Sequence, residues 1–165
     1  MMPDYRIRAA TPADVDALVH HRIAMFREMG TSFEADSVAS AFGDWVTKLL
    51  PAGTYRGWVV EGPSGDIVAG GGITILPWPP GPWYVGGRIA FVYNVYTEAA
   101  HRRRGLARMI MDAIHAWCHL EGIGLVGLNA SSQARPLYES MGYQQMPVPM
   151  MLCGLDQPQP RAPNP

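Results

Sequence analysis

One stretch of the sequence, residues 94–108, constrains the fold more than any other. It reads NVYTEAAHRRRGLAR: an apolar and aromatic strand runs into a short polar loop, three arginines and a glycine, and a helix-period pattern follows at once. The first N–H groups of a helix have no partner within the helix and lie at the positive end of its dipole. The stretch therefore predicts an anion-binding turn between a strand and a helix.

The residue types in this turn suit a bulky anion. Gly105 lets the backbone come close to the ligand, and the small Ala107 leaves the next amide uncovered. Positive side chains at a helix N-terminus are unfavourable by about 0.3–1 kcal/mol each, a cost that a bound polyanion offsets. An arginine run alone is more typical of a solvated cluster or a nucleic-acid patch, but its place between strand and helix favours the anion turn. No dinucleotide or Walker glycine motif is present.

Composition indicates one globular domain. The 165 residues are 48% hydrophobic and 16% charged, enough for a proper core, and we expect it to span residues 4–155. The net charge of -1 gives no reason to expect nucleic acid or membrane as a partner. Neither a signal-length apolar run nor paired cysteines occur, which favours a cytoplasmic protein. Residues 156–165 are rich in proline and are expected to be a disordered tail.

Hydrophobic periodicity and turn signals give an order of elements without internal repeats. Three glycines, residues 70–72, stand inside one expected strand and indicate a bulge or a close approach of backbone or ligand. The expected elements are a strand at 5–9, helices at about 12–29 and within 31–50, strands at 55–61, 67–76 and 88–97, a helix from 104 to about 121, a strand at 125–130, a short helix at 132–140 and an interrupted edge strand at 143–152.

Two motifs resemble those of one known family. RRRGLA, residues 102–107, resembles the Arg/Gln-x-x-Gly-x-Gly/Ala signature with which the GNAT superfamily of N-acetyltransferases holds the pyrophosphate of acetyl-coenzyme A. SSQARPLYESMGY, residues 131–143, resembles the family's Asn-x-x-Ala-x-x-Leu-Tyr-x-x-x-Gly-Phe element at identical spacing. The order of the expected elements also resembles that of a GNAT domain, so the resemblance covers about residues 4–153.

The resemblance implies an α/β (α+β) GNAT fold. Its mixed, mostly antiparallel sheet would have six to seven strands flanked by about four helices, and a splayed parallel strand pair would bind coenzyme A. The implied activity is transfer of the acetyl group of acetyl-CoA to a primary amine, by direct attack in a ternary complex. A non-catalytic acyl-CoA-binding regulatory module is the alternative. The implied partners are a small-molecule or peptide amine, with a homodimer as one arrangement, and no nucleic acid or membrane.

The resemblance also assigns roles to residues. Tyr138 would protonate the departing thiolate of coenzyme A, a role that suits a phenol because it is protonated at neutral pH. Main-chain groups of Val95 and Thr97 would pair with pantetheine amides, and an N–H near Val95 would meet the thioester oxyanion. The complete set of expected cofactor-binding residues is Val95, Tyr96, Thr97, Arg102, Arg103, Arg104, Gly105, Leu106, Ala107, Arg108 and Ser131.

The sequence departs from the family pattern in two places. Ser131 stands where asparagine is usual, and its hydroxyl either bonds to pantetheine or caps the helix. Two more residues separate Val95 from Arg102 than in the commoner Val-x-Pro-x-x-Arg version. No general base is identifiable; the open alternatives are Glu28, Glu34, Glu98, His20 and His21.

Two further patterns carry less weight. His115 and His119 have the spacing of a helical metal pair, but no third ligand accompanies them, so we expect no metal. Several aromatic side chains either line an acceptor pocket or belong to ordinary packing. They are Phe33, Trp45, Trp78, Trp83 and Tyr84.

Overall fold

The computed structural model describes residues 4–147, 151, 153 and 155. The chain divides into two compact units, residues 1–129 and 130–165, and each is described by itself. The expectation of one domain over residues 4–155 stays a prediction. The expected tail at 156–165 lies outside the described residues.

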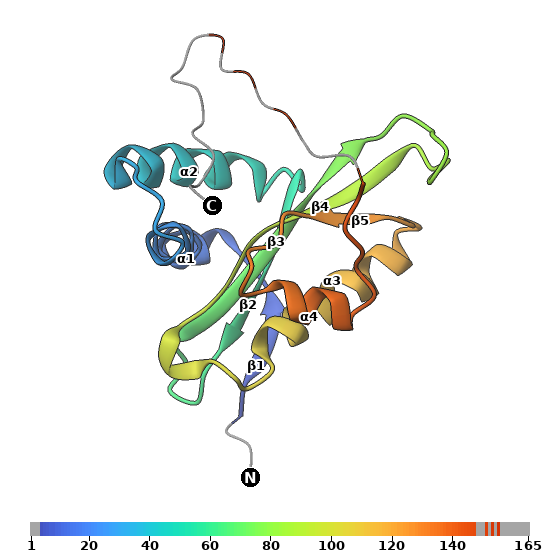
Figure 1. The fold of residues 1–165 in the computed structure, drawn as a ribbon. Coiled ribbons are helices and arrows are strands. Elements are labelled where there is room, and N and C mark those ends of the chain that lie inside the picture. The colour runs from blue at the N-terminus through green and yellow to red at the C-terminus, as the bar shows by residue number, and fades with distance from the viewer. Residues whose placement is uncertain (1–3, 148–150, 152, 154, 156–165) are drawn as a thin grey trace. The chain divides into compact units, whose positions relative to one another are not determined.

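The first unit is built on a five-stranded mixed sheet in the order β1-β2-β3-β4-β5 (Figure 1). The first four strands pair antiparallel, whereas β4 and β5 are parallel. This mixed sheet confirms the expected fold class. The strands are β1 (Arg6–Ala9), β2 (Tyr55–Glu61), β3 (Ile67–Pro77), β4 (Arg88–Thr97) and β5 (Val126–Leu128).

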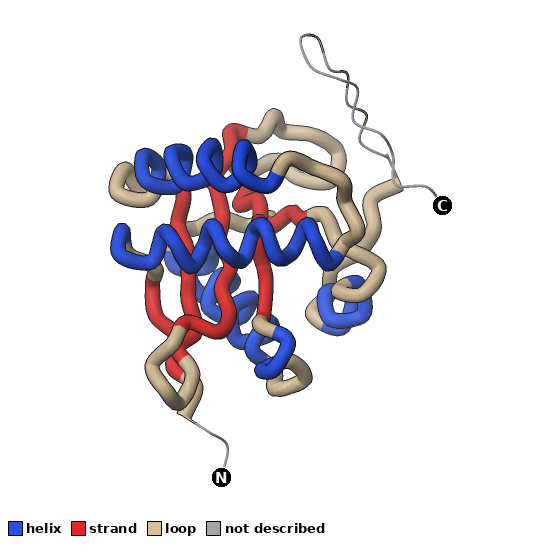
Figure 2. The backbone as a smooth tube through the Cα atoms, turned by 90° about the vertical axis from the view of Figure 1, so that its left-hand side faces the viewer, coloured by secondary structure: helices blue, strands red, loops and turns tan. Residues whose placement is uncertain are grey.

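Helices cover both faces of this sheet. The helices α1 (Val15–Glu28) and α2 (Ala35–Leu49) run side by side across one face, as Figure 2 shows from their side. Helix α3 (Leu106–Leu120) packs on the other face. Neighbouring strand residues point to opposite faces, and a Cβ added at Gly70 would lie 3.1 Å from His21 Nδ1, whereas one added at Gly71 would lie 3.0 Å from Ile110 Cγ2. The two sides of the sheet are therefore distinct environments.

The start of α1 follows from its capping residues. The Asp14 carboxylate accepts hydrogen bonds from the Thr11 backbone N–H at 2.7 Å and from the Thr11 hydroxyl at 3.1 Å. Arg8 donates to both oxygens of the same carboxylate, at 2.7 and 2.9 Å, and so ties β1 to the helix start. The first turn, Pro12–Asp14, is a 3-10 helix, so α1 begins three residues later than the sequence indicated.

The count of six to seven strands is wrong for the described residues. Strand β5 covers only 126–128 instead of 125–130, because its partner β4 diverges after Val92 and offers no further ladder. Residues 143–147 of the expected last strand are not a strand, which fits Pro147, a residue without a backbone N–H. Residues 148–150 and 152 of that strand lie outside the described residues.

The second unit contains a short helix, α4 (Arg135–Ser140). The Ser131 hydroxyl accepts a hydrogen bond from the Ala134 N–H at 3.2 Å, and the Ser131 carbonyl accepts one from the Arg135 N–H at 3.0 Å. The turn after the helix closes at Gly142, whose φ of 91° lies in the left-handed region where glycine is favoured. These bonds fix both ends of a helix too short to be stable alone.

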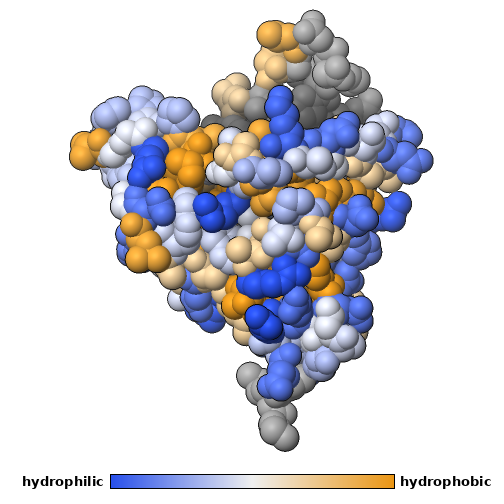
Figure 3. All heavy atoms as spheres, turned by 180° about the vertical axis from the view of Figure 1, so that it is seen from behind, coloured by the Kyte–Doolittle hydropathy of each residue, from blue (hydrophilic) through white to orange (hydrophobic). Residues whose placement is uncertain are grey.

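Hydrophobic side chains also reach the surface. Figure 3 shows them gathered in patches between hydrophilic residues on one face of the molecule. Trp83, Val85 and Leu120 are among the most exposed. No helix in the described part of the chain is long and apolar enough to cross a bilayer.

Candidate functional site

The end of β4 separates from β5. The parallel ladder joins only three residue pairs, the last of them Val92 with Leu128. On its other edge β4 stays paired with β3 as far as Thr97. Residues 93–97 therefore keep the sheet on one side and have no β5 partner on the other. Their backbone groups can bond to a ligand laid along the strand.

A bulge at Asn94 accompanies this separation. Tyr93 lies opposite Gly72 and Tyr96 opposite Gly70, so two residues of β4 face one of β3. Asn94 has φ 60°, a left-handed conformation that asparagine tolerates better than most residues. Its buried Nδ2 donates to the Leu18 carbonyl at 3.0 Å. The bulge is therefore held by the N-terminal part of α1.

The predicted anion turn has the backbone geometry of an anion cradle. After a 3-10 turn, Ala99–His101, the chain passes through left-handed residues at Arg103 (φ 57°) and Gly105 (φ 77°). The first helical bond of α3 runs from the Met109 N–H to the Gly105 carbonyl at 2.9 Å. Within the described residues, the amides of 103–107 have no hydrogen-bond acceptor. Successive unpaired amides of this kind form a concave site for phosphate oxygens.

Gly105 is required by conformation and not by packing. A Cβ added there would meet nothing within 4 Å, but it would stand in a left-handed residue. Leu106 is buried, so only its amide can belong to the cradle. Arg103, Arg104 and Arg108 are exposed around it. The open space at Gly105 and the surrounding cations are what a polyphosphate needs.

Arg102 has a different role from the other three arginines. Its Nη2 donates to both carboxylate oxygens of Glu28 at 2.6 Å, and its Nε donates to the Thr97 carbonyl at 2.9 Å. The hydroxyl of Tyr96, itself buried, donates to the same Glu28 carboxylate at 3.1 Å. The Arg102 guanidinium lowers the pKa of Glu28. These contacts tie the turn to the C-terminal end of α1.

Three of the residues considered as general bases lie together. His20 Nε2 is 2.7 Å from a Glu98 oxygen, and His21 Nε2 is 3.8 Å from the same oxygen. His21 is fully buried and neither of its ring nitrogens has a hydrogen-bond partner. Burial lowers its pKa to about 4, so the ring is neutral at pH 7. Glu28 is bound to Arg102 instead, and Glu34 precedes α2.

Tyr138 and Ser131 belong to the second unit. Tyr138 is buried, its ring centroid lies 5.6 Å from that of Tyr143, and burial raises its pKa. The phenol is therefore protonated at neutral pH. Ser131 uses its hydroxyl to cap the turn before α4, which is one of the two roles considered for it.

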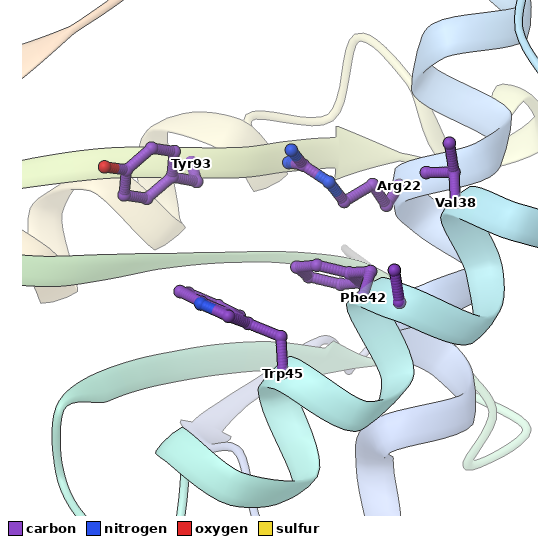
Figure 4. A pocket seen from close by; sticks show the side chains of 6 residues that line it. Arg22, Val38, Phe42, Trp45 and Tyr93 are labelled. Atoms are coloured by element: carbon purple, nitrogen blue, oxygen red, sulfur yellow. The ribbon is translucent and has the colours of Figure 1, made fainter. Parts of the chain in front are cut away.

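A pocket opens on the α1 and α2 side of the sheet. Its volume is about 400 Å³, within the range of small-molecule sites. Figure 4 shows the Arg22 guanidinium above the Phe42 ring, with Tyr93 on the strand to one side. The guanidinium carbon is 4.8 Å from the Phe42 ring centroid, and burial lowers the Arg22 pKa. The lining residues are Arg22, Val38, Ala41, Phe42, Trp45 and Tyr93.

Only one of the five aromatic residues considered for an acceptor pocket lines this one. That residue is Trp45, whose ring also packs edge-on against Tyr55 at 5.3 Å. Phe33 packs against Phe26, and Tyr84 donates from its hydroxyl to the Arg88 carbonyl at 3.1 Å. Trp78 and Trp83 are exposed. The loop between β3 and β4 therefore contributes nothing to the pocket.

His115 and His119 line a smaller hollow of about 180 Å³ beside Cys118. Burial lowers the pKa of His115 and raises that of the Cys118 thiol. Across the described ranges, no three histidine, cysteine or acidic side chains come together as a metal site would require.

Strands β2 to β5 and the turn that follows β4 lie in a segment of the chain that matches a known protein family. Residues 53–145 match the family model of the acetyltransferase (GNAT) domain. The chain belongs to the GNAT acetyltransferase family. The match includes β4, the amide cradle and Tyr138. No curated protein matches the chain.

Solved structures of acetyltransferases share this fold. A GCN5-related N-acetyltransferase from Ralstonia eutropha JMP134 is 30% identical with a TM-score of 0.82, covering 91% of this chain and 99% of that one. A predicted acetyltransferase from Clostridium acetobutylicum, solved with acetyl-CoA, is 24% identical with a TM-score of 0.83, covering 93% and 99%. A possible acetyltransferase from Clostridium difficile 630 is 19% identical with a TM-score of 0.74, covering 93% and 99%.

Sequence reasoning missed three residues of this site, although two of them left a signal. Asn94 interrupts an apolar strand, where asparagine is rare, and it tolerates left-handed backbone. Arg22 falls on the apolar stripe of α1, three residues after Val19 and four before Phe26. Tyr93 gave no signal, because an aromatic residue is ordinary in a strand.

Proposed function

We propose that this GNAT protein transfers the acetyl group of acetyl-CoA to a primary amine by direct attack in a ternary complex. The observation that carries the proposal is the run of unpaired amides at residues 103–107, directly after a strand end without a β5 partner. One element offers hydrogen bonds to a pyrophosphate and the other to the amides of a pantetheine arm. The acetyl-CoA in the similar Clostridium acetobutylicum structure supports the same cosubstrate.

Different residues of the site would bind different parts of acetyl-CoA. The amides of 103–107 and the exposed side chains of Arg103, Arg104 and Arg108 would hold the pyrophosphate. Main-chain groups of Val95 and Thr97 would pair with the pantetheine arm, with Tyr96 between them facing α1. Arg102 would position the turn through Glu28 rather than contact phosphate with its guanidinium.

The chemical step would use two groups of the protein, a backbone N–H and a phenol. A neutral amine attacks the thioester carbonyl carbon, the C–S bond breaks, and the amine loses its extra proton to solvent. The Val95 N–H would bond to the oxyanion of the tetrahedral intermediate. Tyr138, kept protonated by its raised pKa, would donate a proton to the departing thiolate and recover it from water.

A thiol-release assay tests the proposal. Purified protein with acetyl-CoA and a panel of amines is expected to release coenzyme A only when an amine is present, and mass spectrometry should find the amine 42 Da heavier, the mass of an added acetyl group. Calorimetric titration with coenzyme A provides a separate measure of cosubstrate binding. If coenzyme A binds and no amine in the panel is acetylated, the chain is a non-catalytic acyl-CoA-binding module.

A further inference from the structure

The pocket between α1, α2 and β4 contains a cation without a counter-ion. The half-buried guanidinium of Arg22 lies over two rings, with its carbon 4.9 Å from the Phe26 centroid and 4.8 Å from that of Phe42. No carboxylate in the described part of the chain comes within ion-pair distance of it. The titratable groups that it faces, Tyr55 and Tyr93, are phenols and not carboxylates.

An arrangement of this kind is unfavourable unless something else binds there. A charge withdrawn from water needs a partner of opposite charge, and ring faces compensate only part of the loss. Two other partly buried arginines in the first unit have carboxylate partners, whereas Arg56 has none among the described residues and lies over the Trp117 ring, 4.6 Å from its centroid. Arg8 pairs with Asp14 and Glu61, and Arg102 pairs with Glu28. Arg22 differs because its guanidinium opens into a pocket.

The pocket also lies close to the place where the thioester is proposed to bind. Tyr93, in its wall, precedes Val95 by two residues on the same strand, with the Asn94 bulge between them. Apart from Arg22 and the Tyr93 hydroxyl, the lining consists of apolar and aromatic side chains, and no acidic residue is present to attract a polycation. A volume of about 400 Å³ suits a small molecule rather than a folded protein.

We propose that this pocket selects small acceptor amines that carry an anionic group, a carboxylate or a phosphate, which pairs with Arg22. The carbon skeleton of the acceptor packs on Phe42 and Trp45, and its amine extends toward Val95. Arg22 is thereby a specificity-determining residue, and polyamines and aminoglycosides are poor substrates because they place like charge beside it. This inference rests on the proposed function, whose acceptor it specifies.

Matched amines test it directly. Lysine and cadaverine share a distal primary amine and differ by a carboxylate; O-phosphoethanolamine and ethanolamine differ by a phosphate. The wild-type protein is expected to show at least tenfold higher kcat/KM for the anionic member of one or both pairs. The two pairs also show whether carboxylate or phosphate is preferred. Equal rates within both pairs, or a preference for the members without an anionic group, would overturn the inference.

Variants connect the preference to Arg22. Arg22→Gln should lower kcat/KM for the amines with an anionic group at least tenfold and leave kcat/KM for their counterparts without one within twofold. Arg22→Lys should keep part of the preference. Arg27→Gln is the matched control, because Arg27 is an exposed arginine on the same helix. Coenzyme A affinity should be the same in all three variants. A loss shared equally by amines with and without an anionic group would mean that Arg22 only supports the fold.

Calorimetry separates this inference from the activity. Each anionic amine is titrated into the coenzyme A complex, which needs no turnover. If no amine is acetylated but anionic amines bind to wild type and not to Arg22→Gln, the proposed function fails and the anion site stands. If amines are acetylated without any dependence on their charge, the function stands and the anion site fails. Absence of Arg22-dependent binding in both pairs refutes the anion site.

Discussion

Replacement of Gly105 by alanine isolates the role of the amide cradle. With φ at 77° and nothing within 4 Å of the added Cβ, the substitution creates strain but no clash. The expected cost in the free energy of unfolding is about 1–2 kcal/mol, which is about 2–8 °C in Tm for a chain of this length. The methyl group also stands where phosphate would approach, and each lost charge-assisted hydrogen bond weakens binding by about 1.5–3 kcal/mol. We therefore expect a 10- to 100-fold higher Kd for coenzyme A.

Gly65→Ala is the matched control for this experiment. Gly65 lies in the turn between β2 and β3 with φ 86°, and a Cβ there would also meet nothing within 4 Å. Both variants should lose similar stability in thermal denaturation, and only Gly105→Ala should lose affinity in calorimetric titration with coenzyme A. Gly105→Glu should abolish binding by adding a like charge. Equal coenzyme A affinity in Gly105→Ala and Gly65→Ala would refute the assignment of the cradle.

Three more predictions concern the chemistry and the fold. Tyr138→Phe should lower kcat about 10²- to 10⁴-fold in the thiol-release assay while Kd for coenzyme A stays within twofold, and an unchanged kcat would remove the catalytic assignment. Because the His21 pKa is lowered to about 4, the unfolded chain binds more protons than the folded one between pH 6.5 and 4. The free energy of unfolding, measured by urea denaturation, should therefore fall by up to about 3 kcal/mol as the pH falls through that window. His21→Gln should remove this slope, and a slope that persists would assign it to other groups. Gly72→Ala should lower the free energy of unfolding by about 3 kcal/mol, because the added Cβ would overlap the Tyr55 hydroxyl group. Gly81→Ala, in open space, should leave it unchanged in the same urea denaturation assay. Similar free energies of unfolding for the two variants would contradict the close approach.

The local sequence was sufficient to predict the ends of a helix or strand wherever turn-forming residues directly flank that element. The predicted bounds of β2 and β4 are those observed, because apolar runs end there at glycine and proline turns or at the polar loop before the arginines. The glycines at 70–72 were expected to mark a bulge or a close approach of backbone or ligand. The register does shift there, although the extra residue of the bulge lies in β4, and the close approach is made by a side chain, because Tyr55 fills the space beside Gly72. The left-handed Gly105 likewise agrees with the turn that its position indicated.

What the sequence could not give depends on contacts between distant elements. Strand β5 ends early because Asn94, thirty-two residues before its first residue, bulges β4 away from it. The environment of Arg22 depends on how α2 packs over α1, which brings Phe42 to the guanidinium. No local pattern in α1 specifies that neighbour. The position of an arginine on the apolar stripe of α1 was the one signal in the sequence that pointed to Arg22.

Helix α1 connects the two halves of the proposed reaction. Arg22 faces the pocket, and Glu28, six residues later or about 9 Å along the axis, holds the phosphate turn through Arg102. If the turn at residues 103–107 moved when coenzyme A bound, α1 would move with it, and α1 also carries Arg22, the proposed counter-ion of the acceptor. Whatever factor coenzyme A imposes on acceptor affinity, the acceptor must impose on coenzyme A affinity in return. The Arg102 to Glu28 ion pair is thus the place where an ordered or a random sequence of substrate addition would be decided.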